Sequence, residues 1–157
     1  MNVKTHILDI IREFNKRGYR YVLIGRQAVI QYGAPLMSID YDFWIHPEDK
    51  EAILSFLADE DGFEGPSSDT KKPIAIVYLE EEKIDLFFYR HIINRDGTKL
   101  SFEDCFSRAL VKEDPDGDFF IRIPCIDDLI VLKRIRKASP KDEEDIRYLI
   151  IAKKEQL

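Results

Sequence analysis

The stretch IDYDFW, residues 39–44, places two aspartates among large apolar side chains in a segment that otherwise has the composition of a β-strand. Asp is depleted in strands and costly to bury, so two of them need a specific reason. Because side chains alternate between the two faces of a strand, Asp40 and Asp42 point to one side while Tyr41 and Phe43 point to the other. The segment therefore predicts a strand with one acidic face and one apolar face.

A third acid, Asp85, lies in KIDLFFY (residues 83–89), another strand candidate with large apolar neighbours. If the two strands are adjacent, three carboxylates converge, and their mutual repulsion raises their pKa values unless a cation neutralises them. Hard cations such as Mg²⁺ or Mn²⁺ suit these oxygen ligands and retain water and substrate phosphate as further ligands. The alternative is a strand with a solvated face, on which the acids bind nothing.

The segment before the acidic strand predicts a turn that can hold a phosphate. YVLIG (residues 21–25) has the pattern of a short buried strand, and GRQAVIQYG (residues 25–33) suits a turn into a short helix. Backbone N–H groups and the positive end of the helix dipole favour an anion at such a turn. A phosphate site at Gly25 would then lie beside the metal site.

The rest of the chain predicts further helices and strands in alternation. We expect helices over residues 3–17, 47–60, 102–110, 125–137 and 140–154, a strand over 74–80, a hairpin over 111–124 and an exposed polar loop over 65–73. This order indicates an α/β (α+β) fold with a mixed sheet and helices packed against it. At 157 residues we expect one domain, with a core over about 1–124 and C-terminal helices over about 125–157.

Composition excludes some classes of protein. The net charge of −6 argues against nonspecific nucleic-acid binding, and no segment approaches the roughly 18 apolar residues of a membrane span. The first residues lack the continuous apolar stretch of a secretory signal, so we expect a cytoplasmic protein. Cys105 and Cys125 have no metal-type spacing and are expected to be structural. High charge with few amide side chains is a weak indication of a thermophile.

Four motifs together resemble the nucleotidyltransferase superfamily. They are LIG at 23–25, the intervening AVIQYGAP, DYD at 40–42 and IDLF at 84–87. The chain is most similar to the small AbiEii-like and minimal nucleotidyltransferases, whose members often occur in toxin–antitoxin systems. The tail IPCIDDLIVLKRIRKASPKDEEDIRYL resembles the closing helices of that family, with matching residues at Lys133, Lys141, Asp142 and Asp145.

The resemblance implies a role for each candidate residue. Asp40 and Asp42 would ligate Mg²⁺ on the triphosphate of an NTP, and Asp85 would bind a second metal or deprotonate the acceptor hydroxyl. The turn at Gly25 would hold the β- and γ-phosphates. Lys133 would contact a phosphate or the acceptor, the alternative being a solvated lysine at the end of an apolar helix face. The implied partners are an NTP, a hydroxyl acceptor (small molecule, protein or RNA) and an antitoxin-type protein.

The sequence departs from the family pattern at Arg26, which replaces the small second residue of the turn. Arg26 either clamps a phosphate with its planar guanidinium or fills the triphosphate site. Two functions follow: a metal-dependent nucleotidyltransferase that moves an NMP group to a hydroxyl, or a catalytically silent relative that binds nucleotide or protein. A third possibility is an unrelated α/β domain whose acids face solvent. The position of Asp85 relative to Asp40 and Asp42 separates the third from the others.

Overall fold

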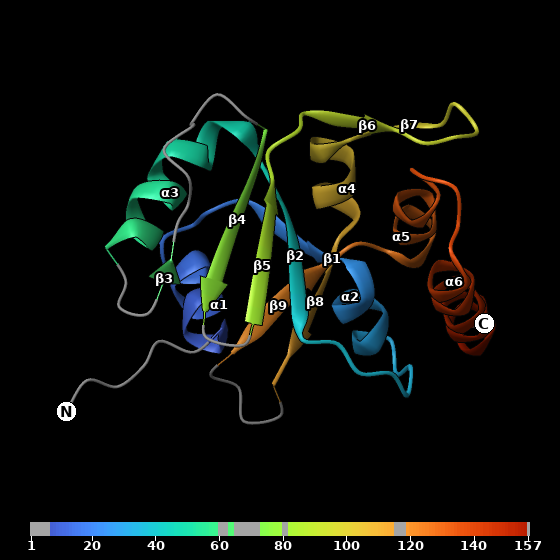
Figure 1. Cartoon of the computed structure of the whole chain (residues 1–157). Helices are drawn as coiled ribbons and strands as arrows, with labels where there is room; N and C mark the ends of the chain where they lie inside the picture. Colours follow the sequence, from blue (N-terminus) through green and yellow to red (C-terminus); the bar gives the residue numbers. More distant parts are fainter. Residues whose placement is uncertain (1–6, 60–62, 65–72, 80–81, 115–118, 157) are drawn as a thin grey trace.

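A computed structural model describes residues 7–59, 63–64, 73–79, 82–114 and 119–156 of the chain (Figure 1). The elements in chain order are α1 (Ile7–Lys16), β1 (Tyr21–Ile24), α2 (Gly25–Gln31), β2 (Asp40–Ile45), the 3₁₀ turn Pro47–Asp49, α3 (Lys50–Ala58), β3 (Phe63–Glu64), β4 (Ile74–Leu79), β5 (Glu82–Phe87), β6 (His91–Ile93), β7 (Lys99–Ser101), α4 (Phe102–Arg108), β8 (Leu110–Glu113), β9 (Phe120–Ile123), α5 (Ile126–Lys133) and α6 (Pro140–Glu155).

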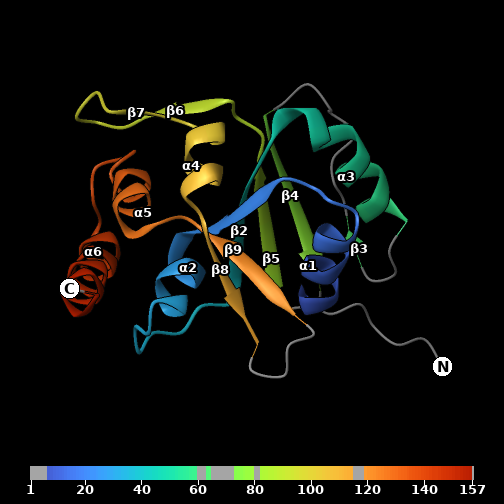
Figure 2. The same ribbon diagram turned by 180° about the vertical axis from the view of Figure 1, so that it is seen from behind.

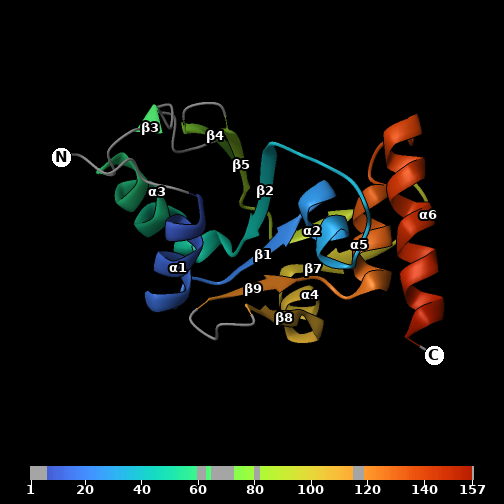
Figure 3. The ribbon, with the colours of Figure 1, turned by 90° about the horizontal axis from the view of Figure 1, so that it is seen from below.

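A five-stranded mixed sheet of order β1-β2-β5-β4-β3 forms the centre of the molecule. The β2 and β5 strands pair in parallel, and the other neighbours in this sheet are antiparallel. Figure 3 shows α1 and α3 on one side of the sheet and α2, α5 and α6 on the other. The expected α/β fold with a mixed sheet and packed helices is confirmed.

The two faces of β2 have different neighbours, as the alternation of its residues predicted. Phe43 packs against Phe14 of α1 with ring centroids 5.6 Å apart, and Phe14 also contacts Phe56 of α3. Trp44 points to the other face, where it packs edge-on against Phe102 of α4. The apolar face of β2 is therefore buried under α1 and α3, which leaves Asp40 and Asp42 on the face toward the C-terminal helices.

Two short hairpins lie outside the main sheet. The β8–β9 hairpin was predicted, and β9 lies beside β1 behind the sheet (Figure 2); its expected turn at Asp116-Gly117 lies outside the described residues. The β6–β7 hairpin was not predicted. Its strands have three residues each, too short for an alternating pattern, and they are joined by a turn in which Asn94 Oδ1 accepts hydrogen bonds from the N–H groups of Asp96 and Thr98.

The C-terminal helices are set by strong local signals. At the start of α6, Ser139 Oγ accepts from the N–H of Asp142, whose carboxylate accepts from the N–H of Ser139, so the two residues form a capping box ahead of Pro140. The α5 helix ends at Lys133, four residues earlier than predicted, and Arg134 closes it. Among the described residues, no helix combines the length and apolar character that crossing a membrane requires.

Candidate active site

Asp42 and Asp85 face each other across the parallel pair of strands. The sheet register places Asp42 directly opposite Asp85 on β5 and opposite Ile24 on β1. The Asp85 carboxyl group is close enough to raise the pKa of Asp42. Asp85 Oδ1 is buried without a hydrogen-bond partner among the described residues, although Lys83 Nζ lies 3.5 Å from Oδ2. The predicted convergence of acids from two strands thus holds for this pair.

Asp40 is at the edge of this arrangement. It lies at the first position of β2 on the same face as Asp42, and its side chain is exposed. The nearby loop is fixed by a hydrogen bond from Gln27 Nε2 to the carbonyl of Ser38, at 2.7 Å. Within the described residues, no three His, Cys, Asp or Glu side chains are gathered into a metal site. Asp40 therefore lines the site without joining the carboxyl pair.

Gly25 permits the close approach of the turn to Asp42. Its φ of +70° is a left-handed conformation that favours glycine. A Cβ atom added at this position would lie 2.4 Å from Asp42 Oδ2, so a side chain here would displace the carboxylate. The glycine predicted as part of a phosphate turn thus leaves room for Asp42.

Burial and the neighbouring acid raise the pKa of Asp42. Desolvation has the largest effect, followed by the hydrogen bond and the charge repulsion from Asp85, while the positive charge of Lys133 opposes both; together they raise the pKa of Asp42 to about 7. A proton held between two carboxyl groups relieves their repulsion when no cation is present. A divalent cation would replace that proton.

A buried carboxylate on α6 holds two basic side chains at the site. Asp145 is fully buried, and its Oδ1 accepts a hydrogen bond from Arg26 Nε at 3.0 Å. Lys133 Nζ lies 2.7 Å from Asp145 Oδ2, an ionic contact rather than an aligned hydrogen bond. A terminal nitrogen of Arg26 also binds Glu144, at 2.8 Å. These ion pairs connect α2, α5 and α6.

These contacts change the interpretation of Lys133 and Arg26. The side chain of Lys133 is only 12% exposed, so the alternative of a solvated lysine is wrong. Arg26 lines the site, but at least two of its nitrogens are engaged by carboxylates of α6. The resemblance gave Asp145 as a residue that matches the family's closing helices, but sequence reasoning did not identify Arg26 and Lys133 as its partners.

The acids and bases line one cavity of about 290 Å³. Its lining includes all three predicted acids and, facing them, cations from the C-terminal segment. The charged residues in the lining are Asp40, Asp42, Asp85, Asp142, Arg26, Lys133, Arg136 and Lys141. A neighbouring cavity of about 230 Å³, which we call the connecting region, is lined by Gly25 and shares Asp42 and Lys133 with the first cavity. The predicted loop over residues 65–73 lies largely outside the described residues.

The donor set fits a hard divalent cation. Asp42 and Asp85 supply adjacent carboxylates, and the buried Asp85 Oδ1 has no hydrogen-bond partner within the described residues. Oxygen-only ligands of this kind suit Mg²⁺ and Mn²⁺ better than softer metals. Lys133 and Arg136 offer positive charge for a phosphate on the other side of the same cavity.

Replacing Asp145 with Ala should strongly destabilise the fold. Arg26 and Lys133 would keep their burial but lose a shared counter-charge, and breaking a buried ion pair typically costs about 3–5 kcal/mol. Urea unfolding should show this loss. The matched control is Asp127→Ala, which breaks an exposed ion pair with Lys153 and should change stability by no more than about 1 kcal/mol. Equal effects of the two substitutions would contradict the role of Asp145.

The raised pKa of Asp42 predicts the pH dependence of stability without divalent metal. A carboxyl whose pKa is raised on folding stabilises the fold when protonated, and this contribution is lost as pH rises from about 4 through about 7. Asp42→Asn should therefore be more stable than wild type at pH 8, by on the order of 1–3 kcal/mol, and close to it at pH 4. Thermal unfolding in EDTA measures this, with the exposed Asp40→Asn as control. A wild type as stable as Asp42→Asn at pH 8 would contradict the prediction.

No family model and no curated protein matches the sequence at a significant level, whereas solved structures do. Lincosamide antibiotic adenylyltransferase LnuA, bound to lincomycin, is 16% identical with a TM-score of 0.66, over 95% of this chain and 98% of that chain. A protein from Thermotoga maritima, TM1012, assigned as a nucleotidyltransferase, is 15% identical with a TM-score of 0.56, over 96% and 85%. ANT(2'')-Ia in complex with adenylyl-2''-tobramycin is 15% identical with a TM-score of 0.53, over 93% and 86%.

Identities this low establish the fold and not the reaction. None of these neighbours supports the AbiEii-like subtype that the sequence motifs implied. The similarity nonetheless extends over nearly the whole chain. The protein thus has the nucleotidyltransferase-like fold that its sequence motifs implied.

Proposed function

We propose that the protein transfers a nucleoside monophosphate group from an NTP to a hydroxyl group of a small molecule, with Mg²⁺ or Mn²⁺. The observation that carries this proposal is the single cavity with the acids Asp40, Asp42 and Asp85 on one wall and the bases Lys133, Arg136 and Lys141 on the other. A bound metal ion would neutralise the acidic wall, and the triphosphate would pair with the basic wall. Similar folds in two antibiotic-modifying enzymes support a hydroxyl-bearing acceptor.

The residues have separable tasks in this reaction. The acceptor oxygen forms a bond to the α-phosphorus, the bond from that phosphorus to the pyrophosphate oxygen breaks, and the hydroxyl proton passes to Asp85. Asp42 and Asp85, with Asp40 beside them, would hold the cation, which neutralises charge on the phosphates. Lys133 and Arg136 would bind the phosphate oxygens and keep the NTP in line for attack.

Arg26 has a structural role that accounts for its departure from the family pattern. Its ion pairs with Asp145 and Glu144 attach α6 to the start of α2. An Arg26 that holds α6 in place is compatible with catalysis. Arg26 therefore no longer favours the alternative of a catalytically silent relative that binds nucleotide or protein. The neighbours named above are two antibiotic-modifying enzymes and TM1012, and they give no support to a toxin–antitoxin role or an antitoxin-type partner.

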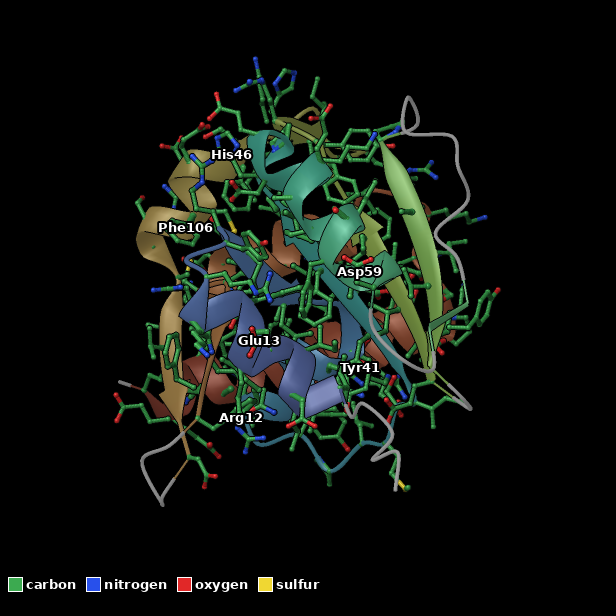
Figure 4. All side chains as sticks on the ribbon, turned by 90° about the vertical axis from the view of Figure 1, so that its left-hand side faces the viewer. Arg12, Glu13, Tyr41, His46, Asp59 and Phe106 are labelled. Atoms are coloured by element: carbon green, nitrogen blue, oxygen red, sulfur yellow. The ribbon has the colours of Figure 1, made fainter. Side chains whose placement is uncertain are left out.

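The proposal predicts pyrophosphate release that depends on Asp42. With labelled NTPs, Mg²⁺ or Mn²⁺, and a panel of hydroxyl compounds that includes lincomycin and tobramycin, Asp42→Asn should lower the rate by at least about 10²-fold, because charge stabilisation at a reacting phosphate is worth that much. The control is Asp59→Asn at the end of α3, on the opposite side of the sheet (Figure 4). It should retain wild-type activity.

Two results would count against this function. Pyrophosphate release that persists in Asp42→Asn would show that the proposed site does not carry out the reaction. Metal-dependent NTP binding without transfer to any acceptor in a broad panel would instead indicate a nucleotide-binding module.

A further inference from the structure

A second cavity, of about 380 Å³, adjoins the acidic site and has a different chemical character. It is formed by the ends of β1 and β5, the start of β4, the β6 strand and the segment after α5. Its aliphatic and aromatic lining is Ile24, Ile74, Phe87, Ile92, Ile93 and Ile135. We call these six residues, with the rings of Tyr89 and His91, the apolar cavity. Its size lies within the range of small-molecule sites.

Several side chains of the apolar cavity are exposed to solvent. Ile93 is 58% exposed, Ile135 41% and Ile74 40%. Single exposed apolar residues are common, but these three come from distant parts of the sequence and line one concavity. A ligand with an apolar surface would remove them from water together.

The apolar cavity shares lining residues with both cavities that contain the reacting groups. Phe87 follows Asp85 by two residues on the same face of β5, a rise of about 7 Å along a strand. Phe87 also lines the acidic cavity, and Ile24, Phe87 and Ile135 line the connecting region that contains Asp42. A molecule seated in the apolar cavity can therefore extend a substituent to Asp85.

The charges around the apolar cavity indicate which molecules it accepts. No carboxylate is part of its described lining. The charged groups in the connecting region are Asp42, Lys133, Arg136 and Asp142. The cation would occupy Asp42. An acceptor with several ammonium groups would lose hydration in the apolar cavity without gaining an ion pair. An acceptor with an uncharged body would avoid this loss of hydration.

We propose that the apolar cavity binds the acceptor, and that the acceptor is a neutral alcohol with an apolar or aromatic body whose hydroxyl group reaches Asp85. The inference rests on the proposed nucleotidyl transfer. A nucleobase is the competing occupant, but none of the three bases proposed for the triphosphate lines the apolar cavity, and Lys141 lines only the acidic cavity that also contains Ser38 and Asp40. The apolar cavity lies beyond Phe87 from these groups.

The test uses isoleucine methyl groups as reporters, because five of the lining residues are isoleucines. The protein is labelled with ¹³C at Ile δ1-methyls and titrated with 2-naphthaleneethanol, a neutral aromatic alcohol, with and without Mg²⁺ and a nonhydrolysable ATP analogue. We expect saturable shifts at Ile74, Ile92 and Ile93 that persist when the nucleotide is bound. Ile135→Ala should weaken the alcohol's affinity by about 5- to 10-fold.

A matched control is available on α6. Ile150 is 41% exposed, the same fraction as Ile135, but it does not line the apolar cavity, so Ile150→Ala should leave the affinity unchanged. The inference is overturned if the alcohol leaves the reporter methyls unshifted, if nucleotide displaces it, or if tobramycin, a polycation, shifts them as strongly. Failure of the nucleotide analogue to bind, with the alcohol shifts intact, would instead count against the proposed transfer reaction.

Discussion

The burial of Asp145 between Arg26 and Lys133 is the constraint on which the site depends. A fully buried carboxylate requires compensating charge, and these two side chains supply it from α2 and α5. The contacts fix the C-terminal helices on the face of the sheet that carries Asp42. The same contacts leave Lys133 close enough to lower the pKa of Asp42 by its charge, so the helices and the sheet form opposing walls of one charged cavity.

The acidic wall follows from how the sheet is buried. One face of β2 and β5 is apolar and covered by α1 and α3, so the strand register is tightly specified. Parallel pairing then sets Asp42 opposite Asp85, whether or not the two charges repel each other. Core packing thus enforces an arrangement that is unfavourable by itself, which is the expected state of a site that binds a cation.

Sequence patterns predicted those features that are encoded locally. Alternation in IDYDFW predicted the two faces of β2, and the helix expected over residues 140–154 begins at Pro140, as α6 does. The partners of Asp145 were beyond prediction, because Arg26 lies 119 residues away and an ion pair leaves no periodic signal. The apolar cavity was missed for a similar reason, since its lining is assembled by the short β6 strand and the unpredicted end of α5. Asp40 was expected to join the other acids, but its place at the exposed first position of β2 keeps it apart.

The proposed transfer requires that the acidic wall accept a triphosphate only together with a divalent cation. Titration calorimetry with a nonhydrolysable ATP analogue, in Mg²⁺ and in EDTA, measures this directly. At pH 8, above the pKa of Asp42, a polyphosphate without a cation would meet the carboxylates of Asp40, Asp42 and Asp85, so we predict affinity at least about 10-fold higher in Mg²⁺. Equal affinity in the two buffers would contradict the account.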